Sequence, residues 1–120
     1  MAKTTVRFVV SLTIHPGQFE SFDAVAREMT ALTQMEPGTL AYDWYLSPDR
    51  TLCRLYESYV DGSAAIAHMT GRVVQELLPK LLGCSAITGF DVYGDAGPVA
   101  AQMLTGAGAT IFPPWHAIGR

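Results

Sequence analysis

The sequence contains little charge and little cysteine, and each shortage excludes a class of function. Charged residues make up 16% of the 120 residues, with eight Lys and Arg against eleven Asp and Glu and a formal net charge of −3. The few basic residues are scattered along the chain, so they create no positive field of the kind that holds a polyanion. We therefore expect no nucleic acid partner.

Cysteine is represented by Cys53 and Cys84, which lie in no CxxC motif and beside no second soft ligand at metal-binding spacing. Two free buried thiols are the expected state, and a disulfide between them is the alternative. The sequence shows no pattern of ligands for a metal site.

Long apolar runs are also missing. The first segment contains a short apolar stretch that Ser11 and Thr13 interrupt. It is too short for a membrane span and lacks the small-residue cleavage pattern of a signal peptide. We expect a cytoplasmic protein with no membrane partner.

Hydrophobic residues are abundant by contrast, at 49% of the chain. A chain of 120 residues has room for one compact domain with a real core. So large an apolar share indicates surface that is buried elsewhere, for example between subunits. A monomer would be the unexpected assembly.

The spacing of apolar residues predicts the secondary structure. A period of two indicates strands, and spacings of three and four indicate helices after Pro16 and after Asp61. Pro79 removes a backbone donor and is expected to bend or shorten the second helical region. The predicted elements are strand 5–14, helix 16–35, strands 40–46 and 52–59 around the turn 47–50, a short helix 64–69 that Asp61 or Ser63 can cap, a helix 73–82, and strand 87–93.

This order, β-α-β-β-α-β, predicts an α+β ferredoxin-like fold (split βαβ), with a four-stranded antiparallel sheet that carries helices on one face only. The other face is then bare. Its expected residues Val9, Ala41, Leu55 and Tyr59 are too apolar to form a continuous patch in water. Pairing this face with a second copy is the simplest way to cover it, so a homodimer is expected.

The last residues are not needed by this plan. We expect a ferredoxin-like domain at 1–95 and a C-terminal extension at 96–120. The extension contains the helix-compatible segment 98–104 and several large apolar residues close together, which a disordered linker would not normally carry. It is expected to dock on the domain across the mouth of a pocket, or on the partner subunit.

The segment Glu36–Gly71 resembles the antibiotic biosynthesis monooxygenase family of dimeric α+β barrel proteins. The similar parts are the opening Glu36–Leu40, the strand end Tyr56–Tyr59 and the pair Ala67 and His68. Many members oxidise quinols or aromatic polyketides without metal or flavin. The resemblance therefore implies a monooxygenase that oxidises a small aromatic quinol or polyketide-type phenol with molecular oxygen. It also implies that the enzyme needs no cofactor.

Two departures from related patterns restrict this reading. The heme-degrading branch of the fold uses an Asn, a Trp and a His where this chain has Val10, His68 and Val73 or its neighbours. Heme degradation is therefore disfavoured. Many quinol-oxidising relatives also have a second His shortly after the Ala-His pair, and this chain has none there.

His68 is the predicted catalytic base, because imidazole titrates near neutral pH and the side chain can point from a short helix toward the sheet. Tyr42, Trp44 and Tyr56 are predicted to wall a substrate site, where they would stack on a planar ring and donate to an oxyanion. Glu57 is predicted to take part in substrate binding, either orienting His68 or lying in solvent.

Each of these residues also has a structural reading. His68 can be a helix histidine that is satisfied by Glu57 or by a backbone carbonyl. Aromatic residues dominate ordinary cores and strands. His15 is expected at the surface, and His116 can reach a site only if the tail folds inward. The functional alternative is thus a non-catalytic dimer, either an aromatic-ligand-binding or a stress-related protein.

Overall fold

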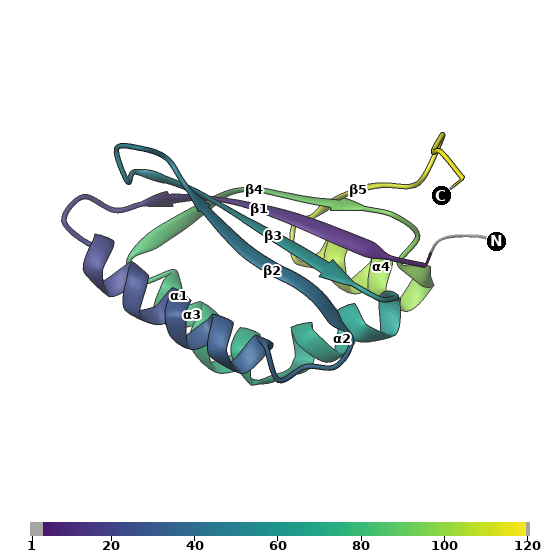
Figure 1. The fold of residues 1–120 in the computed structure, drawn as a ribbon, viewed down its shortest axis with the longest axis horizontal. Helices are drawn as coiled ribbons and strands as arrows, with labels where there is room; N and C mark the ends of the chain where they lie inside the picture. The colour runs from purple at the N-terminus through teal and green to yellow at the C-terminus, as the bar shows by residue number, and fades with distance from the viewer. Residues whose placement is uncertain (1–3, 120) are drawn as a thin grey trace.

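The computed structural model describes residues 4–119. The chain forms a β-α-β-β-α-β unit followed by one more helix and one more strand (Figure 1). The elements are β1 (Val6–Ile14), α1 (Phe19–Thr33), β2 (Thr39–Leu46), β3 (Leu52–Tyr59), α2 (Gly62–Thr70), the π-helical segment η1 (Val73–Leu77), α3 (Leu78–Leu81), β4 (Ser85–Tyr93), α4 (Gly97–Gly106) and β5 (Thr110–Phe112).

The strands form one sheet in the order β2-β3-β1-β4-β5. The first four strands pair antiparallel, as predicted, whereas β5 pairs parallel to β4. The prediction of a four-stranded, purely antiparallel sheet was therefore wrong, because the sheet is mixed and has five strands. The chain reaches β5 through α4, the kind of crossover that a parallel pair requires.

Helices α1 to α4 lie on one side of the sheet (Figure 1). Side chains alternate across a strand, so every second residue of β1 points at these helices. Val6, Phe8, Leu12 and Ile14 are buried there, and Arg7 between them is exposed.

The predicted composition of the bare face was partly wrong. Leu55 and Tyr59 were assigned to it, but both point toward the helices and are buried. Val9 and Ala41 do lie half-exposed on the open side. β3 has apolar residues at both parities, so its sequence does not specify which set faces the core.

Two local features shape the helices above the sheet. Asp61 caps α2, since its carboxylate accepts a hydrogen bond from the backbone N–H of Ala64 at 2.9 Å. Ser63, the other predicted cap, lies inside the helix. Further on, the Leu78 N–H donates to the Val73 carbonyl, which widens the turn just before Pro79. Pro79 was expected to bend or shorten this helical region, and the structure has the π-turn there.

The core has two parts along the sheet. One part lies under α1, η1 and α3 and includes Leu12, Phe22 and Met29. The other lies under α2 and α4 and includes Phe8 and Tyr59. The site described below lies where the two parts meet.

The C-terminal extension contributes to the second part through α4. Ala100 and Leu104 are fully buried. A Cβ on Gly62 would lie 1.9 Å from the Ala96 carbonyl oxygen, so only glycine allows α2 and the start of α4 to approach this closely. Beyond β5 the chain is irregular, and Trp115 is 88% exposed.

Cys53 and Cys84 are free and buried, which confirms the expected thiol state. Within residues 4–119, no three His, Cys, Asp or Glu side chains gather in a way that would hold a metal ion. No helix in the described part of the chain is both long enough and apolar enough to cross a membrane.

Candidate functional site

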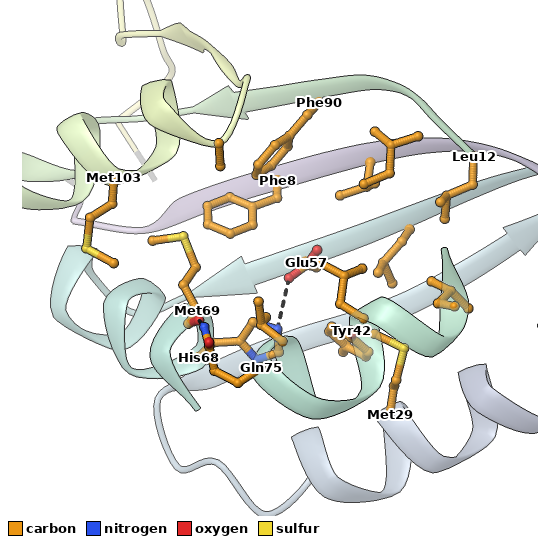
Figure 2. A pocket seen from close by; sticks show the side chains of 17 residues that line it. Phe8, Leu12, Met29, Tyr42, Glu57, His68, Met69, Gln75, Phe90 and Met103 are labelled. Atoms are coloured by element: carbon orange, nitrogen blue, oxygen red, sulfur yellow. Dashed lines mark hydrogen bonds and ion pairs between the residues drawn. The ribbon is translucent and has the colours of Figure 1, made fainter. Parts of the chain in front are cut away.

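A cavity of about 280 Å³ lies between the helices and the sheet (Figure 2). Most of its wall is apolar. Phe8 and Phe90 come from the strands, and Met29, Met69 and Met103 come from three different helices. The polar groups on its wall are the side chains of Tyr42, Glu57, His68 and Gln75.

The local fold explains why these polar groups converge. Glu57 lies two residues from Leu55 on β3, so both point at the helices. Tyr42 is paired directly with Glu57 across the β2–β3 hairpin. His68 sits in the last turn of α2, which passes over this pair. The π-turn contributes Val74 and Gln75 to the cavity wall, and Gln75 lies beside His68 (Figure 2).

His68 is buried, with 3% of its surface exposed, and both ring nitrogens face carboxylates. Its Nδ1 is 2.9 Å from Oε1 and 3.1 Å from Oε2 of Glu36. Its Nε2 is 3.5 Å from Oε1 of Glu57. The rings of Tyr42 and Tyr59 each lie 5.4 Å from the imidazole, centroid to centroid. This imidazole is thus held between two acids and two aromatic rings.

Glu57 is the buried acid of this group. Its Oε1 accepts a hydrogen bond from the Tyr59 hydroxyl and faces His68. Its Oε2 has no hydrogen-bond partner among residues 4–119. Figure 2 shows the carboxyl in the space between Phe8 and His68. One acceptor oxygen therefore remains free for a molecule in the cavity.

Burial sets the protonation behaviour of the site. It raises the pKa of Glu57 above its ordinary value, while His68 and the Tyr59 hydroxyl oppose the shift. Burial and the nearby charge of Glu57 also raise the pKa of Tyr42 and Tyr59. Both phenols consequently stay protonated at neutral pH and can only donate or accept hydrogen bonds. Glu57 and His68 remain as the groups that can exchange a proton.

The structure brings three of the five predicted site residues together, namely Tyr42, Glu57 and His68. Trp44 lies behind Tyr42, with 5.7 Å between their ring centroids, and its Nε1–H donates to the Thr30 hydroxyl at 2.8 Å. It packs between strand and helix and does not line the cavity.

Tyr56 is placed on the other side of the sheet. It is half-exposed, and its neighbours Leu55 and Glu57 point the opposite way. It therefore cannot reach the cavity of its own chain. His15 and His116 are both exposed and lie outside the site.

Sequence reasoning missed two residues of this cluster. Glu36 was noted only as part of a similar motif, and its partner His68 lies 32 positions away. Tyr59 was expected on the bare face, although its hydroxyl bonds Glu57. The position of Tyr59 could have been predicted from that of Glu57, because residues two apart on one strand share a face of the sheet.

The model of the antibiotic biosynthesis monooxygenase family matches residues 5–79, which span β1 to α3. No curated protein matches the chain. Solved structures share the fold at low identity. MupZ from Pseudomonas fluorescens is 20% identical with a TM-score of 0.83, over 98% of this chain and 95% of that one. A match of this extent includes α4 and β5.

Other similar structures cover less of the chain. A putative antibiotic biosynthesis monooxygenase from Nitrosomonas europaea is 20% identical with a TM-score of 0.67, over 77% of this chain and 88% of that one. SnoaB, a cofactor-independent oxygenase from Streptomyces nogalater, is 18% identical with a TM-score of 0.67, over 74% of this chain and 90% of that one. These likenesses concern the fold, whereas the family match covers more than half of the sequence. The chain belongs to the antibiotic biosynthesis monooxygenase family.

Proposed function

We propose that this protein is a cofactor-independent monooxygenase that oxidises a small phenol or hydroquinone with molecular oxygen. The family membership supports monooxygenation in general. The observation that carries the proposal is the free Oε2 of Glu57, a buried acceptor beside His68 in a largely apolar cavity. SnoaB, which shares the fold, is a cofactor-independent oxygenase.

The first step is removal of a proton from the substrate hydroxyl. The Glu57 carboxylate accepts this proton at Oε2, while the Tyr59 hydroxyl, which donates to Oε1, stabilises the carboxylate before the transfer. Burial strengthens Glu57 as a base, because its raised pKa lies closer to that of a phenol. Glu57 thus takes the role predicted for His68, and His68 is its immediate partner.

The second step needs no further protein group. The phenolate passes one electron to oxygen, and the resulting radical pair combines into a peroxide inside the apolar cavity. The peroxide takes back the proton held by Glu57. Loss of water converts a hydroquinone and O₂ into a hydroxyquinone and water. The substrate supplies all the electrons, so no external reductant enters the balance.

The cavity size restricts the substrate. A volume of about 280 Å³ lies just below the roughly 300–1,000 Å³ usual for ligand pockets. The two phenylalanines and three methionines of its wall suit the faces and edges of an aromatic ring. A compact aromatic therefore fits better than an extended polycycle.

The open face of the sheet supports a homodimer. Tyr45, Tyr93 and Phe112 are between 40% and 60% exposed, and the last two rings stack 5.4 Å apart. Burying such side chains against a second copy removes apolar area from water. Sedimentation should therefore give twice the chain mass at micromolar concentration, and a single-chain mass would overturn the dimer.

The same acid suits a second class of reaction. Because its pKa is raised, Glu57 can also hold a proton and donate it, which is the chemistry of an isomerase or another proton-transfer enzyme that consumes no oxygen. Oxygen dependence separates the two candidates, since a proton transfer proceeds equally well under argon.

The test is oxygen uptake with a panel of hydroquinones and anthrones, followed by mass spectrometry with ¹⁸O₂. The proposal predicts uptake equal to product and one labelled oxygen per product molecule. Product formation without oxygen would favour proton transfer. Tight binding of the panel with no product would favour the non-catalytic aromatic-binding dimer.

A further inference from the structure

Glu36 lies outside the cavity yet makes the shortest contacts to its histidine. Both of its carboxylate oxygens are within 3.1 Å of His68 Nδ1. An ionised carboxylate accepts only, so Nδ1 carries the proton and Nε2 is the nitrogen that faces Glu57. Without Glu36, nothing else among residues 4–119 bonds Nδ1 and selects this arrangement.

We infer that Glu36 is a positioning residue, which holds His68 with Nε2 toward Glu57 and connects this buried pair to solvent. The inference deepens the proposed function and rests on it for its effect on rate. The arrangement of the three residues can be tested without any turnover.

The loop that carries Glu36 is built to stay beside α2. A Cβ on Gly38 would lie 2.7 Å from the Ala64 Cβ, so a larger residue would push the loop away from the helix. The Gly38 carbonyl accepts from the Val60 N–H at 3.0 Å. The Thr39 hydroxyl donates to Glu36 Oε1 at 2.8 Å. The carboxylate is therefore held before His68 binds it, which lowers the entropy cost of the contact.

The surroundings leave few competing partners for the imidazole. The titratable groups that face it are Glu36 from the α1–β2 loop, Tyr42 from β2, and Glu57 and Tyr59 from β3. Both tyrosines stay protonated because burial raises their pKa. One imidazole thus lies between two carboxylates, and a proton on Nε2 can be shared only with Glu57.

The same geometry provides a route for protons. Glu57 is 6% exposed at its side chain and Glu36 is 28% exposed. The buried acid is separated from bulk water, whereas Glu36 touches it. One turnover releases no net proton, because Glu57 returns the substrate proton to the peroxide when water is lost. Between turnovers the pair can exchange protons with solvent through Nε2 and Nδ1 of His68 and through Glu36. This keeps water out of the cavity while the base is reset.

The direct test is ¹⁵N NMR of the His68 ring in the full-length protein, assigned with His68→Asn. In the wild type, Nδ1 should carry the proton of the neutral ring. Glu36→Ala should move the proton to Nε2, and Glu36→Gln should leave a mixture. Glu28→Gln is the matched control, since Glu28 is exposed on α1. The wild-type tautomer in Glu36→Ala would overturn the inference.

Activity gives the second readout. Removing a residue that orients a functional side chain typically costs 10- to 100-fold, so kcat of Glu36→Gln should fall by about tenfold or more with KM unchanged. Gly38→Val should give the same loss with the charge intact, because it displaces the loop. If Glu36→Gln and Gly38→Val turn over as fast as Glu28→Gln, Glu36 has no role in turnover.

The two proposals fail differently. If the wild type consumes no oxygen with any substrate, the monooxygenase proposal falls and the NMR result still decides whether Glu36 positions His68. If oxygen uptake is found and depends on Glu57, but the His68 tautomer is the same with and without Glu36, only the inference about Glu36 falls. Unfolding curves in urea show whether each variant is folded.

Discussion

The Tyr59 hydroxyl donates a hydrogen bond to the Glu57 carboxyl from two positions further along the same strand. Both side chains point at the helices, and both are buried. An acid in this position needs a donor, because an unpaired buried carboxylate loses its hydration without replacement. The bond therefore stabilises the charged form of Glu57 and, through it, the base proposed here.

Removing that donor should destabilise the protein in a pH-dependent way. Tyr59→Phe deletes one hydrogen bond to a charged group, so the free energy of unfolding should fall by about 1–3 kcal/mol at pH 8. The loss should be smaller at pH 5, where Glu57 with its raised pKa is closer to the neutral form. Urea unfolding at both pH values measures this, with Tyr45→Phe as the exposed control. An equal loss at both pH values would contradict it.

The Glu57 carboxyl should itself give stability a slope with pH. Because its folded pKa lies above the unfolded value of about 4.3, the folded state binds more protons between the two values, and its contribution to stability falls as pH rises through that interval. Glu57→Gln removes this pH dependence. Between the two pKa values, the free energy of unfolding of the variant should therefore rise relative to that of the wild type by up to about 1.4 kcal/mol per pH unit. Urea unfolding from pH 4 to 8 tests this.

The control for that experiment is Glu76→Gln. Glu76 is exposed and pairs with Arg72 on the same helical segment, so its removal changes charge without touching the buried site. The difference between Glu76→Gln and the wild type should not grow with pH above about 5, where a solvated carboxyl is fully ionised. Parallel curves for Glu57→Gln and Glu76→Gln would show that Glu57 has no raised pKa.

His68 and Tyr56 should differ sharply in their effect on rate. His68→Ala leaves Glu57 without its neighbouring imidazole and should lower kcat/KM by about tenfold or more, which is less than the roughly hundredfold loss expected when the base Glu57 itself is removed. Tyr56→Phe should leave the rate unchanged, because Tyr56 is on the open face of the sheet. Oxygen uptake at saturating oxygen measures both. A large loss in Tyr56→Phe would mean that the open face contributes to the site.

Filling the cavity should block the ligand without unfolding the protein. Val10 lines the cavity from β1, and Val10→Phe places a ring in the substrate volume. Binding of a fluorescent naphthol should be lost, while the stability changes by less than the 1–3 kcal/mol typical of overpacking. Val99→Phe makes the same change at an exposed position and should bind normally. Undiminished binding in Val10→Phe would place the ligand elsewhere.

Much of the fold could be predicted because periodicity reports local geometry. The spacing of Phe22 and Met29 predicted α1, and the alternation around the turn 47–50 predicted the hairpin. β5 could not be predicted in this way, because three residues carry no period. Its pairing with β4 depends on where α4 docks, which is a tertiary contact.

The site could be predicted only in part, for a related reason. His68 and Glu57 were identified through the resemblance and the chemistry of their side chains. Glu36 could not be given a role, since its contact with His68 joins a loop to a distant helix. Tyr56 was assigned to the cavity because β3 has aromatic residues at both parities, and only the packing decides which parity faces inward.

The measurement that tests the central claim most directly is the ¹⁸O₂-dependent turnover of a hydroquinone by wild type, Glu57→Gln and Glu76→Gln. The account predicts label in the product of the wild type and of Glu76→Gln at equal rates, and a rate at least a hundredfold lower for folded Glu57→Gln. Equal turnover by all three proteins would contradict it, because oxygen chemistry would then proceed without the buried acid.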